Sequence, residues 1–183
     1  DVGIMLELAR ASSYCDQDFF KGWVIAGVEV SINGEASQYT NELVLKSKRR
    51  CVMLVQGLDD DGRLQKQLKI VLILPRKVGQ DNINSEIISG ELIGEHIFTA
   101  EEINAYTHLV GDENTLHSQP RPIVPGILLL NWLQQVTAAK FLHWKARFLQ
   151  PVYAGELLQV YEKQEMLVGY VNSSKVFTVN KID

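Results

Sequence analysis

The sequence predicts an α+β fold in which helices pack on antiparallel sheet. Near the N-terminus, apolar residues recur at helical spacing, and four strand-like segments separated by turn residues follow. The same order, a helix and then four strand-like segments, recurs in the second half of the chain. Strands that follow one another through short turns form antiparallel sheets, whereas strands that alternate with helices form parallel ones.

The composition fits one ordinary domain or two small ones. The chain has 183 residues, of which 46% are hydrophobic and 22% charged, and a net charge of −4. We expect no membrane span, because no apolar run reaches about eighteen residues. We expect no nucleic-acid partner, because the chain carries no strong excess of basic residues. Cys15 and Cys51 lack metal or redox spacing, so we expect free thiols and a cytoplasmic location.

The first half begins with a predicted helix over Gly3–Tyr14, where apolar residues repeat every three or four positions. Turn residues, among them Asp59-Asp60-Asp61-Gly62, separate the segments that follow. The predicted strands are Trp23–Ile32, Tyr39–Lys46, Cys51–Gly57 and Leu64–Leu74. The polar residues 79–85 are expected to link a first unit, 1–78, to a second, 86–183.

The second unit opens with a strand region over Glu86–Phe98. Thr99 and Glu102 match a capping box, which predicts a helix that runs through Leu109. A polar loop follows, and residues Gly126–Phe141 are apolar on nearly every side, which indicates a buried helix. The remaining predicted strands are Trp144–Phe148, Leu157–Glu162, Met166–Val171 and Lys175–Val179.

Two short matches suggest that the halves are copies of one unit. Ile4-Met-Leu-Glu7 aligns with Leu128-Leu-Leu-Asn131 at the start of each helix, and Tyr39-Thr-Asn-Glu-Leu43 aligns with Tyr153-Ala-Gly-Glu-Leu157. Internal duplication explains both matches, although two short matches also occur by chance.

The loop between Gly111 and Pro125 carries the side chains best suited to take part in catalysis. Asp112 and His117 lie five positions apart, and a carboxylate beside an imidazole can act as an acid–base pair. The loop ends at Pro125-Gly126, where the unpaired N–H groups of a helix start can stabilise a carbonyl oxygen that gains charge. Taken alone, Asp112 and Asn114 are also typical of a turn that caps its own backbone.

Three motifs in this order resemble the MaoC-like, R-specific enoyl-thioester hydratases. They are Gly111-Asp-x-Asn-x-Leu-His117, Arg121-Pro-Ile-Val-Pro-Gly126 and Phe148-x-x-Pro-Val-x-x-Gly155. The resemblance implies a hotdog fold, in which an antiparallel sheet wraps around a long helix. With the repeat, it implies a double hotdog with two antiparallel sheets, each wrapped around its own central helix.

The sequence departs from this family at two points. Thr115 replaces a usual proline, and Gly126 lies only nine positions after His117. That spacing is similar to the histidine-to-glycine spacing of the FabZ/FabA-type 3-hydroxyacyl-carrier-protein dehydratases. In those enzymes the catalytic acid lies on the central helix of the neighbouring unit. The matching residue of the first half is Glu7, an alternative acid to Asp112. Because the chain begins at the first central helix, without the segment in which a hotdog unit carries its own catalytic loop, we expect residues 1–78 to form a truncated hotdog with no active site of its own.

The resemblance implies interconversion of 3-hydroxyacyl and enoyl thioesters, without cofactor or metal. Asp112 and His117 would activate water, Asn114 would orient the loop or the water, and the Gly126 N–H would bind the thioester oxygen. The substrate would be a thioester of coenzyme A or acyl carrier protein, and the residues expected along its acyl chain are Leu129, Trp132 and Leu133. A non-catalytic thioester-binding module and a hotdog thioesterase remain alternatives. The two hotdog units are expected to pair within one chain, and a homodimer or a larger assembly remains an alternative.

One charged segment is left without a role. The run Lys46-Ser-Lys-Arg-Arg50 is typical of a solvated hairpin end. It is also suited to contact an acyl carrier protein or the phosphates of coenzyme A.

Overall fold

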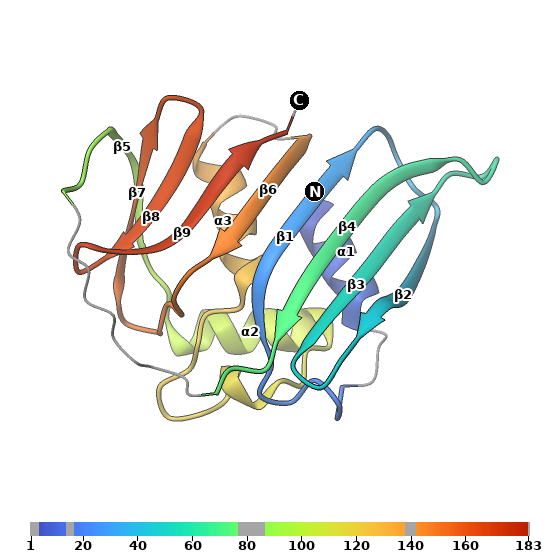
Figure 1. The fold of residues 1–183 in the computed structure, drawn as a ribbon, viewed down its shortest axis with the longest axis horizontal. Coiled ribbons are helices and arrows are strands. Elements are labelled where there is room, and N and C mark those ends of the chain that lie inside the picture. The colour runs from blue at the N-terminus through green and yellow to red at the C-terminus, as the bar shows by residue number, and fades with distance from the viewer. Residues whose placement is uncertain (1–3, 14–16, 77–86, 138–141, 183) are drawn as a thin grey trace.

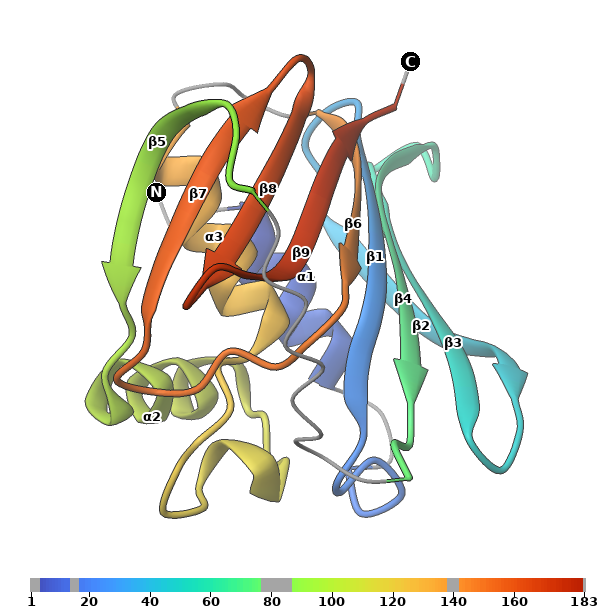
Figure 2. The ribbon, with the colours of Figure 1, turned by 60° about the vertical axis from the view of Figure 1, so that its left-hand side comes forward.

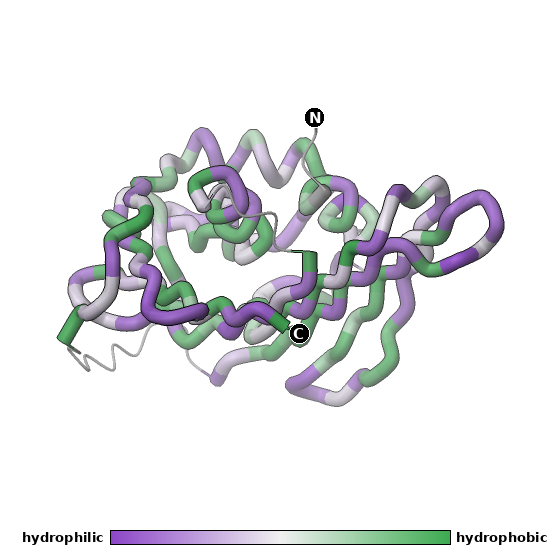
Figure 3. The backbone as a smooth tube through the Cα atoms, turned by 90° about the horizontal axis from the view of Figure 1, so that it is seen from above, coloured by the Kyte–Doolittle hydropathy of each residue, from purple (hydrophilic) through white to green (hydrophobic). Residues whose placement is uncertain are grey.

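In the computed structural model, the chain forms one antiparallel sheet of nine strands with helices on one face (Figure 1). The structure describes residues 4–13, 17–76, 87–137 and 142–182. Seen from above, the helices lie on one side and the strands on the other, and hydrophobic and hydrophilic residues alternate along the strands (Figure 3). This alternation lets one face of the sheet bury its side chains against the helices.

The elements of the first half confirm the predicted order. Helix α1 spans Ile4–Ser13 and buries Met5 and Leu8 at the spacing that places both on one helical face. The strands that follow are β1 (Val24–Ile32), β2 (Gln38–Lys46), β3 (Arg50–Leu58) and β4 (Leu64–Ile73). Residues 79–85, the predicted linker, lie outside the described residues.

The second half also follows the predicted order. Thr99 and Glu102 form both bonds of the capping box that begins α2. The elements are β5 (Glu91–Ile97), α2 (Ala100–Val110), the short 3-10 helix η1 (Thr115–His117), α3 (Gly126–Val136), β6 (His143–Phe148), β7 (Leu157–Lys163), β8 (Met166–Val171) and β9 (Ser174–Lys181). The described part of the predicted Gly126–Phe141 helix ends at Val136, and residues 138–141 are outside the described residues.

The two halves have the same strand order, but they do not form two sheets. In space the order is β2-β3-β4-β1 in the first half and β7-β8-β9-β6 in the second, with β5 added beside β7. Strands β1 and β6 pair through Gly27–Arg147 to Ser31–His143. The expectation of two separate sheets is therefore wrong: a bare edge strand leaves its N–H and C=O groups unpaired, and joining β1 to β6 removes two such edges.

The interior lies between this sheet and α1 and α3, which contact each other on its concave face (Figure 2). The largest fully buried side chains come from both halves and include Met5, Leu68, Leu129, Trp144 and Phe177. Cys51 is a buried free thiol, whereas Cys15 is outside the described residues. Among the helices in the described part of the chain, none has the length and apolar character needed to cross a membrane.

Candidate functional site

A cavity of about 1110 Å³ lies where the two halves meet. One wall comes from the first half, with Ala9, Phe20, Trp23 and Met53 among its residues. The other wall comes from α2, the loop that follows it, the start of α3 and the end of β6. Because both halves supply walls, the cavity depends on the β1–β6 pairing and on the contact between α1 and α3.

The end of α2 places Asp112 at this cavity. Gly111 terminates the helix in the left-handed conformation, with φ of 73°, and the Asp112 N–H donates to the Thr107 carbonyl at 2.9 Å. The Asp112 Oδ1 then accepts the backbone N–H of Asn114 at 2.9 Å. The turn expected from Asp-x-Asn is thus present, and the second carboxylate oxygen stays available to another group.

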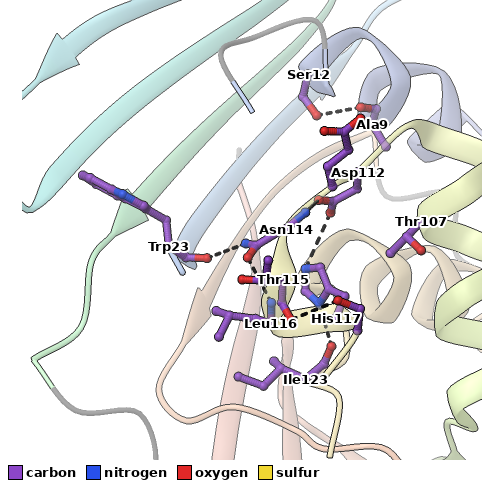
Figure 4. Close-up of polar contacts among 12 residues, drawn as sticks. Ala9, Ser12, Trp23, Thr107, Asp112, Asn114, Thr115, Leu116, His117 and Ile123 are labelled. Atoms are coloured by element: carbon purple, nitrogen blue, oxygen red, sulfur yellow. Dashed lines mark hydrogen bonds and ion pairs between the residues drawn. The ribbon is translucent and has the colours of Figure 1, made fainter. Parts of the chain in front are cut away.

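That second oxygen faces His117 (Figure 4). The two atoms, Asp112 Oδ2 and His117 Nε2, lie 3.5 Å apart, and the side chains are 27% and 11% exposed. The other ring nitrogen, Nδ1, lies 2.7 Å from the Ile123 carbonyl. A carbonyl oxygen only accepts, so Nδ1 carries the proton, and in the neutral ring Nε2 presents its lone pair toward Asp112.

This geometry suits two groups that handle one water molecule. A separation of 3.5 Å is longer than a normal direct hydrogen bond, and both facing atoms are acceptors when the ring is neutral. A water in front of the pair can donate one O–H to each acceptor. The described residues contain no group of three His, Cys, Asp or Glu side chains placed to hold a metal ion.

Asn114 fixes the loop to the first half of the chain. Its Nδ2 donates to the Trp23 carbonyl at 2.8 Å, and its Oδ1 accepts the backbone N–H groups of Gly22 and Leu116, each at 3.2 Å (Figure 4). Of the two roles expected for Asn114, these contacts match orientation of the loop.

Sequence reasoning missed three further residues of the first half that hold the end of α2. Arg10 Nε donates to the Leu109 carbonyl at 3.0 Å, and the Ser13 hydroxyl donates to the Val110 carbonyl at 2.6 Å. Gln17 Nε2 donates to the Gly111 carbonyl at 3.3 Å. The last carbonyls of a helix lack partners within the helix, and these side chains satisfy them. No local sequence signal links residues that are more than ninety positions apart.

The start of α3 forms another part of the cavity wall. Pro125 and Gly126 line the cavity, and no side chain among the described residues caps this helix end. The first N–H groups of a helix have no partner within the helix and lie at the positive end of its dipole. A Cβ at Gly126 would lie only 3.0 Å from the Phe148 ring, so glycine allows this tight packing.

The three residues expected along the acyl chain occupy different surroundings. Leu129 lines the cavity, whereas Trp132 and Leu133 are not among the described lining residues. Trp132 instead stacks on His96, with ring centroids 5.5 Å apart. Tyr106 lines the cavity but had no predicted role; burial, with a smaller effect of the Asp112 charge, raises the pKa of its hydroxyl. This hydroxyl therefore stays protonated.

Glu7, the alternative acid, belongs to a different cluster. Its carboxylate accepts the Tyr39 hydroxyl at 2.8 Å and the Lys66 ammonium at 3.1 Å. Although burial acts in the opposite direction, these bonds hold the pKa of Glu7 below its ordinary value. Lys66 is 1% exposed and also contacts Glu35. The structure thus places Asp112, and not Glu7, opposite the His117 ring.

Comparison with solved structures finds the same fold in HtdX, in MaoC-like dehydratases and in acyl-ACP thioesterases. HtdX from Mycobacterium tuberculosis superimposes with a TM-score of 0.72 at 12% identity, over 97% of this chain and 86% of that chain. A MaoC-like dehydratase from Phytophthora capsici gives 0.57 at 15%, over 88% and 72%. An acyl-ACP thioesterase from Bacteroides thetaiotaomicron gives 0.56 at 9%, over 86% and 74%.

The sequence itself matches no protein-family model and, at a significant level, no curated protein. At these identities, the structural likeness establishes the fold. The chain therefore has the hotdog fold that MaoC-like dehydratases share with acyl-ACP thioesterases, in agreement with its sequence resemblance to the MaoC-like family.

Proposed function

We propose that this protein interconverts enoyl and 3-hydroxyacyl thioesters by adding or removing water. The observation that carries the proposal is the Asp112–His117 pair, 3.5 Å apart, in a cavity that also includes the open start of α3. The motifs of the MaoC-like hydratases and the fold shared with MaoC-like dehydratases support the same reaction.

In hydration, the water oxygen bonds to the β-carbon of the enoyl group while one water proton passes to the Asp112–His117 pair. The Ile123 carbonyl holds His117 with Nε2 free to accept that proton. Negative charge shifts to the thioester oxygen, which the Gly126 N–H is placed to stabilise. A proton delivered to the α-carbon completes the addition of one water, and dehydration follows the same path in reverse.

The acyl chain is proposed to lie between the two halves. The cavity is larger than the 300–1,000 Å³ of common small-molecule sites, and Leu129 faces it together with Phe20, Met53 and Leu72 of the first half. We therefore expect medium or long acyl chains to be accepted in addition to the four-carbon crotonyl group. The proposed acyl pocket does not include Trp132 and Leu133.

The repeated topology supports an interpretation of the chain as two fused hotdog units, 1–78 and 86–183. In each unit a helix precedes four strands in the same spatial order. The second unit supplies Asp112 and His117, and the first supplies the opposite wall and the residues that fix the catalytic loop. The pairing that hotdog units require is then met within one molecule.

Loss of enoyl absorbance with a crotonyl thioester tests the proposal. Asp112→Asn and His117→Ala should each lower kcat by about 100-fold or more, the usual contribution of a positioned acid or base. His96→Ala is a matched control, because His96 lies on the same half and its ring stacks on Trp132 away from the cavity. Unchanged rates in both site variants, with folding verified by thermal melting, would refute the assignment.

A thioesterase is the second candidate, because acyl-ACP thioesterases share the fold. Thioester hydrolysis releases a free thiol, whereas hydration leaves the thioester intact. A thiol reagent added to the crotonyl assay separates the two reactions. Binding of the thioester without turnover would instead support a non-catalytic module.

A further inference from the structure

Five basic side chains form an exposed group, here named the basic rim: Lys46, Lys48, Arg49, Arg50 and Arg76. No carboxylate of the described residues lies within 4.0 Å of any of them, whereas other lysines and arginines, such as Lys69, Lys145 and Arg121, have such partners. The rim stands out because the chain as a whole carries a net charge of −4.

The rim lies at the end of the sheet that contains the cavity. Arg50 pairs with Ile73 across β3 and β4, and the Leu74 N–H donates to the Arg49 carbonyl at 3.0 Å. Ile73 and Pro75 in turn line the cavity. In Figure 1, the β2–β3 hairpin, the end of β4 and the catalytic loop all lie at the lower end of the molecule.

A direct contact joins the rim to the segment that fixes the catalytic loop. The Lys46 ammonium lies 4.0 Å from the centroid of the Phe19 ring. Phe19 is three residues before Gly22, whose N–H donates to Asn114. The segment that contains Phe19 and Gly22 therefore contacts both the basic rim and the loop that carries Asp112 and His117.

The separation between rim and site matches a phosphopantetheine arm. The side chain of Ile25 in β1 lies 3.5 Å from the position of a Gly126 Cβ, and β1, β4 and β3 are consecutive strands. Ile25 pairs with Leu72 of β4, and Leu72 pairs with Cys51 of β3, the residue after Arg50. Two interstrand spacings amount to about 10 Å, so Cys51 lies on the order of 15 Å from Gly126. A phosphopantetheine arm has about the length of four extended residues, also roughly 15 Å.

We propose that the basic rim docks an acidic acyl carrier protein, which delivers its acyl group into the cavity on this arm. The inference rests on the proposed function. None of the five cations lines the cavity, and they spread over a hairpin end and the end of β4, which suits a protein surface better than one nucleotide. Repulsion from the rest of this acidic chain would direct an acidic partner to the rim.

The test compares one acyl group on three carriers: crotonyl thioesters of a purified acyl carrier protein, of coenzyme A and of pantetheine. The variant is Lys48→Glu/Arg49→Glu. Its matched control, Lys163→Glu/Lys181→Glu, makes the same charge change at exposed residues near the opposite end of the sheet (Figure 1). Binding of fluorescently labelled carrier protein is measured separately by anisotropy.

We expect kcat/KM for the carrier-bound substrate to fall at least about tenfold in the rim variant and little in the control. Added salt should weaken the wild-type reaction with that substrate alone. Crotonyl-pantetheine turnover should not change. An unaffected carrier reaction, an equal loss in the control, or a loss confined to crotonyl-coenzyme A would overturn the proposal. Carrier binding that depends on the rim while wild type hydrates none of the thioesters would instead refute the proposed function.

Discussion

Replacement of Asn114 by alanine tests whether the first half of the chain holds the loop that carries Asp112 and His117. The substitution removes three hydrogen bonds, to the Trp23 carbonyl and from the N–H groups of Gly22 and Leu116. A net contribution of about 1 kcal/mol for each bond gives a loss of roughly 2–3 kcal/mol, because the site is only partly buried and water can replace some partners. The measurement is the free energy of unfolding from urea titration.

The same variant should also slow turnover, because Asn114 fixes the loop that carries Asp112 and His117. Asn114→Asp keeps the acceptor oxygen and loses the donor, so we expect an intermediate loss of stability. Asn104→Ala, an exposed substitution on α2, should change stability by less than about 0.5 kcal/mol. A change that small in Asn114→Ala, with normal turnover, would show that the contacts to Gly22 and Trp23 do not hold the loop.

Two further predictions concern the sheet. Gly169→Ala should destabilise the fold by about 1–3 kcal/mol, because the new Cβ would lie 2.1 Å from the buried Phe177 ring. The control is Gly27→Ala, whose new Cβ has its nearest contact at 3.5 Å. Thermal melting of both variants measures the difference. The hydrogen bond from Lys145, aided by Lys69, holds the pKa of Glu29 below its ordinary 4.5. The stability that this carboxylate contributes is present above pH 4.5 and is lost as the pH falls through the lowered pKa. In urea titrations, the free energy of unfolding should therefore fall less between pH 6 and pH 3 in Glu29→Gln than in wild type. An equal fall in both proteins would contradict this.

Local signals in the sequence predicted the α-helices and strands, but not the short 3-10 helix over Thr115–His117. The period of apolar residues located α1, a long apolar run located α3, and the Thr99–Glu102 capping box located the start of α2. The Asp-Gly turn after β3 forms the expected hairpin, in which the Asp59 carboxylate accepts the N–H groups of Asp61 and Arg63. Each of these features depends on neighbours within a few positions along the chain.

Long-range contacts could not be predicted in the same way. The β1–β6 pairing that joins the two sheets into one involves strands more than a hundred positions apart, and no motif specifies it. The interactions of Arg10 and Ser13 with the end of α2 also depend on tertiary packing. Trp132 was expected along the acyl chain but stacks on His96, because α3 is apolar on nearly every side and periodicity does not distinguish the face toward the cavity from the face toward His96.

In the proposed reaction, water adds to the β-carbon of an enoyl thioester at Asp112 and His117. The most direct measurement is mass spectrometry of the product formed from crotonyl-pantetheine in water enriched in heavy oxygen. We predict a 3-hydroxybutyryl thioester that carries one heavy oxygen on its hydroxyl group, formed by wild type and almost absent with His117→Ala. Heavy oxygen in a released free acid, or equal labelling by the variant, would contradict addition of water at this pair.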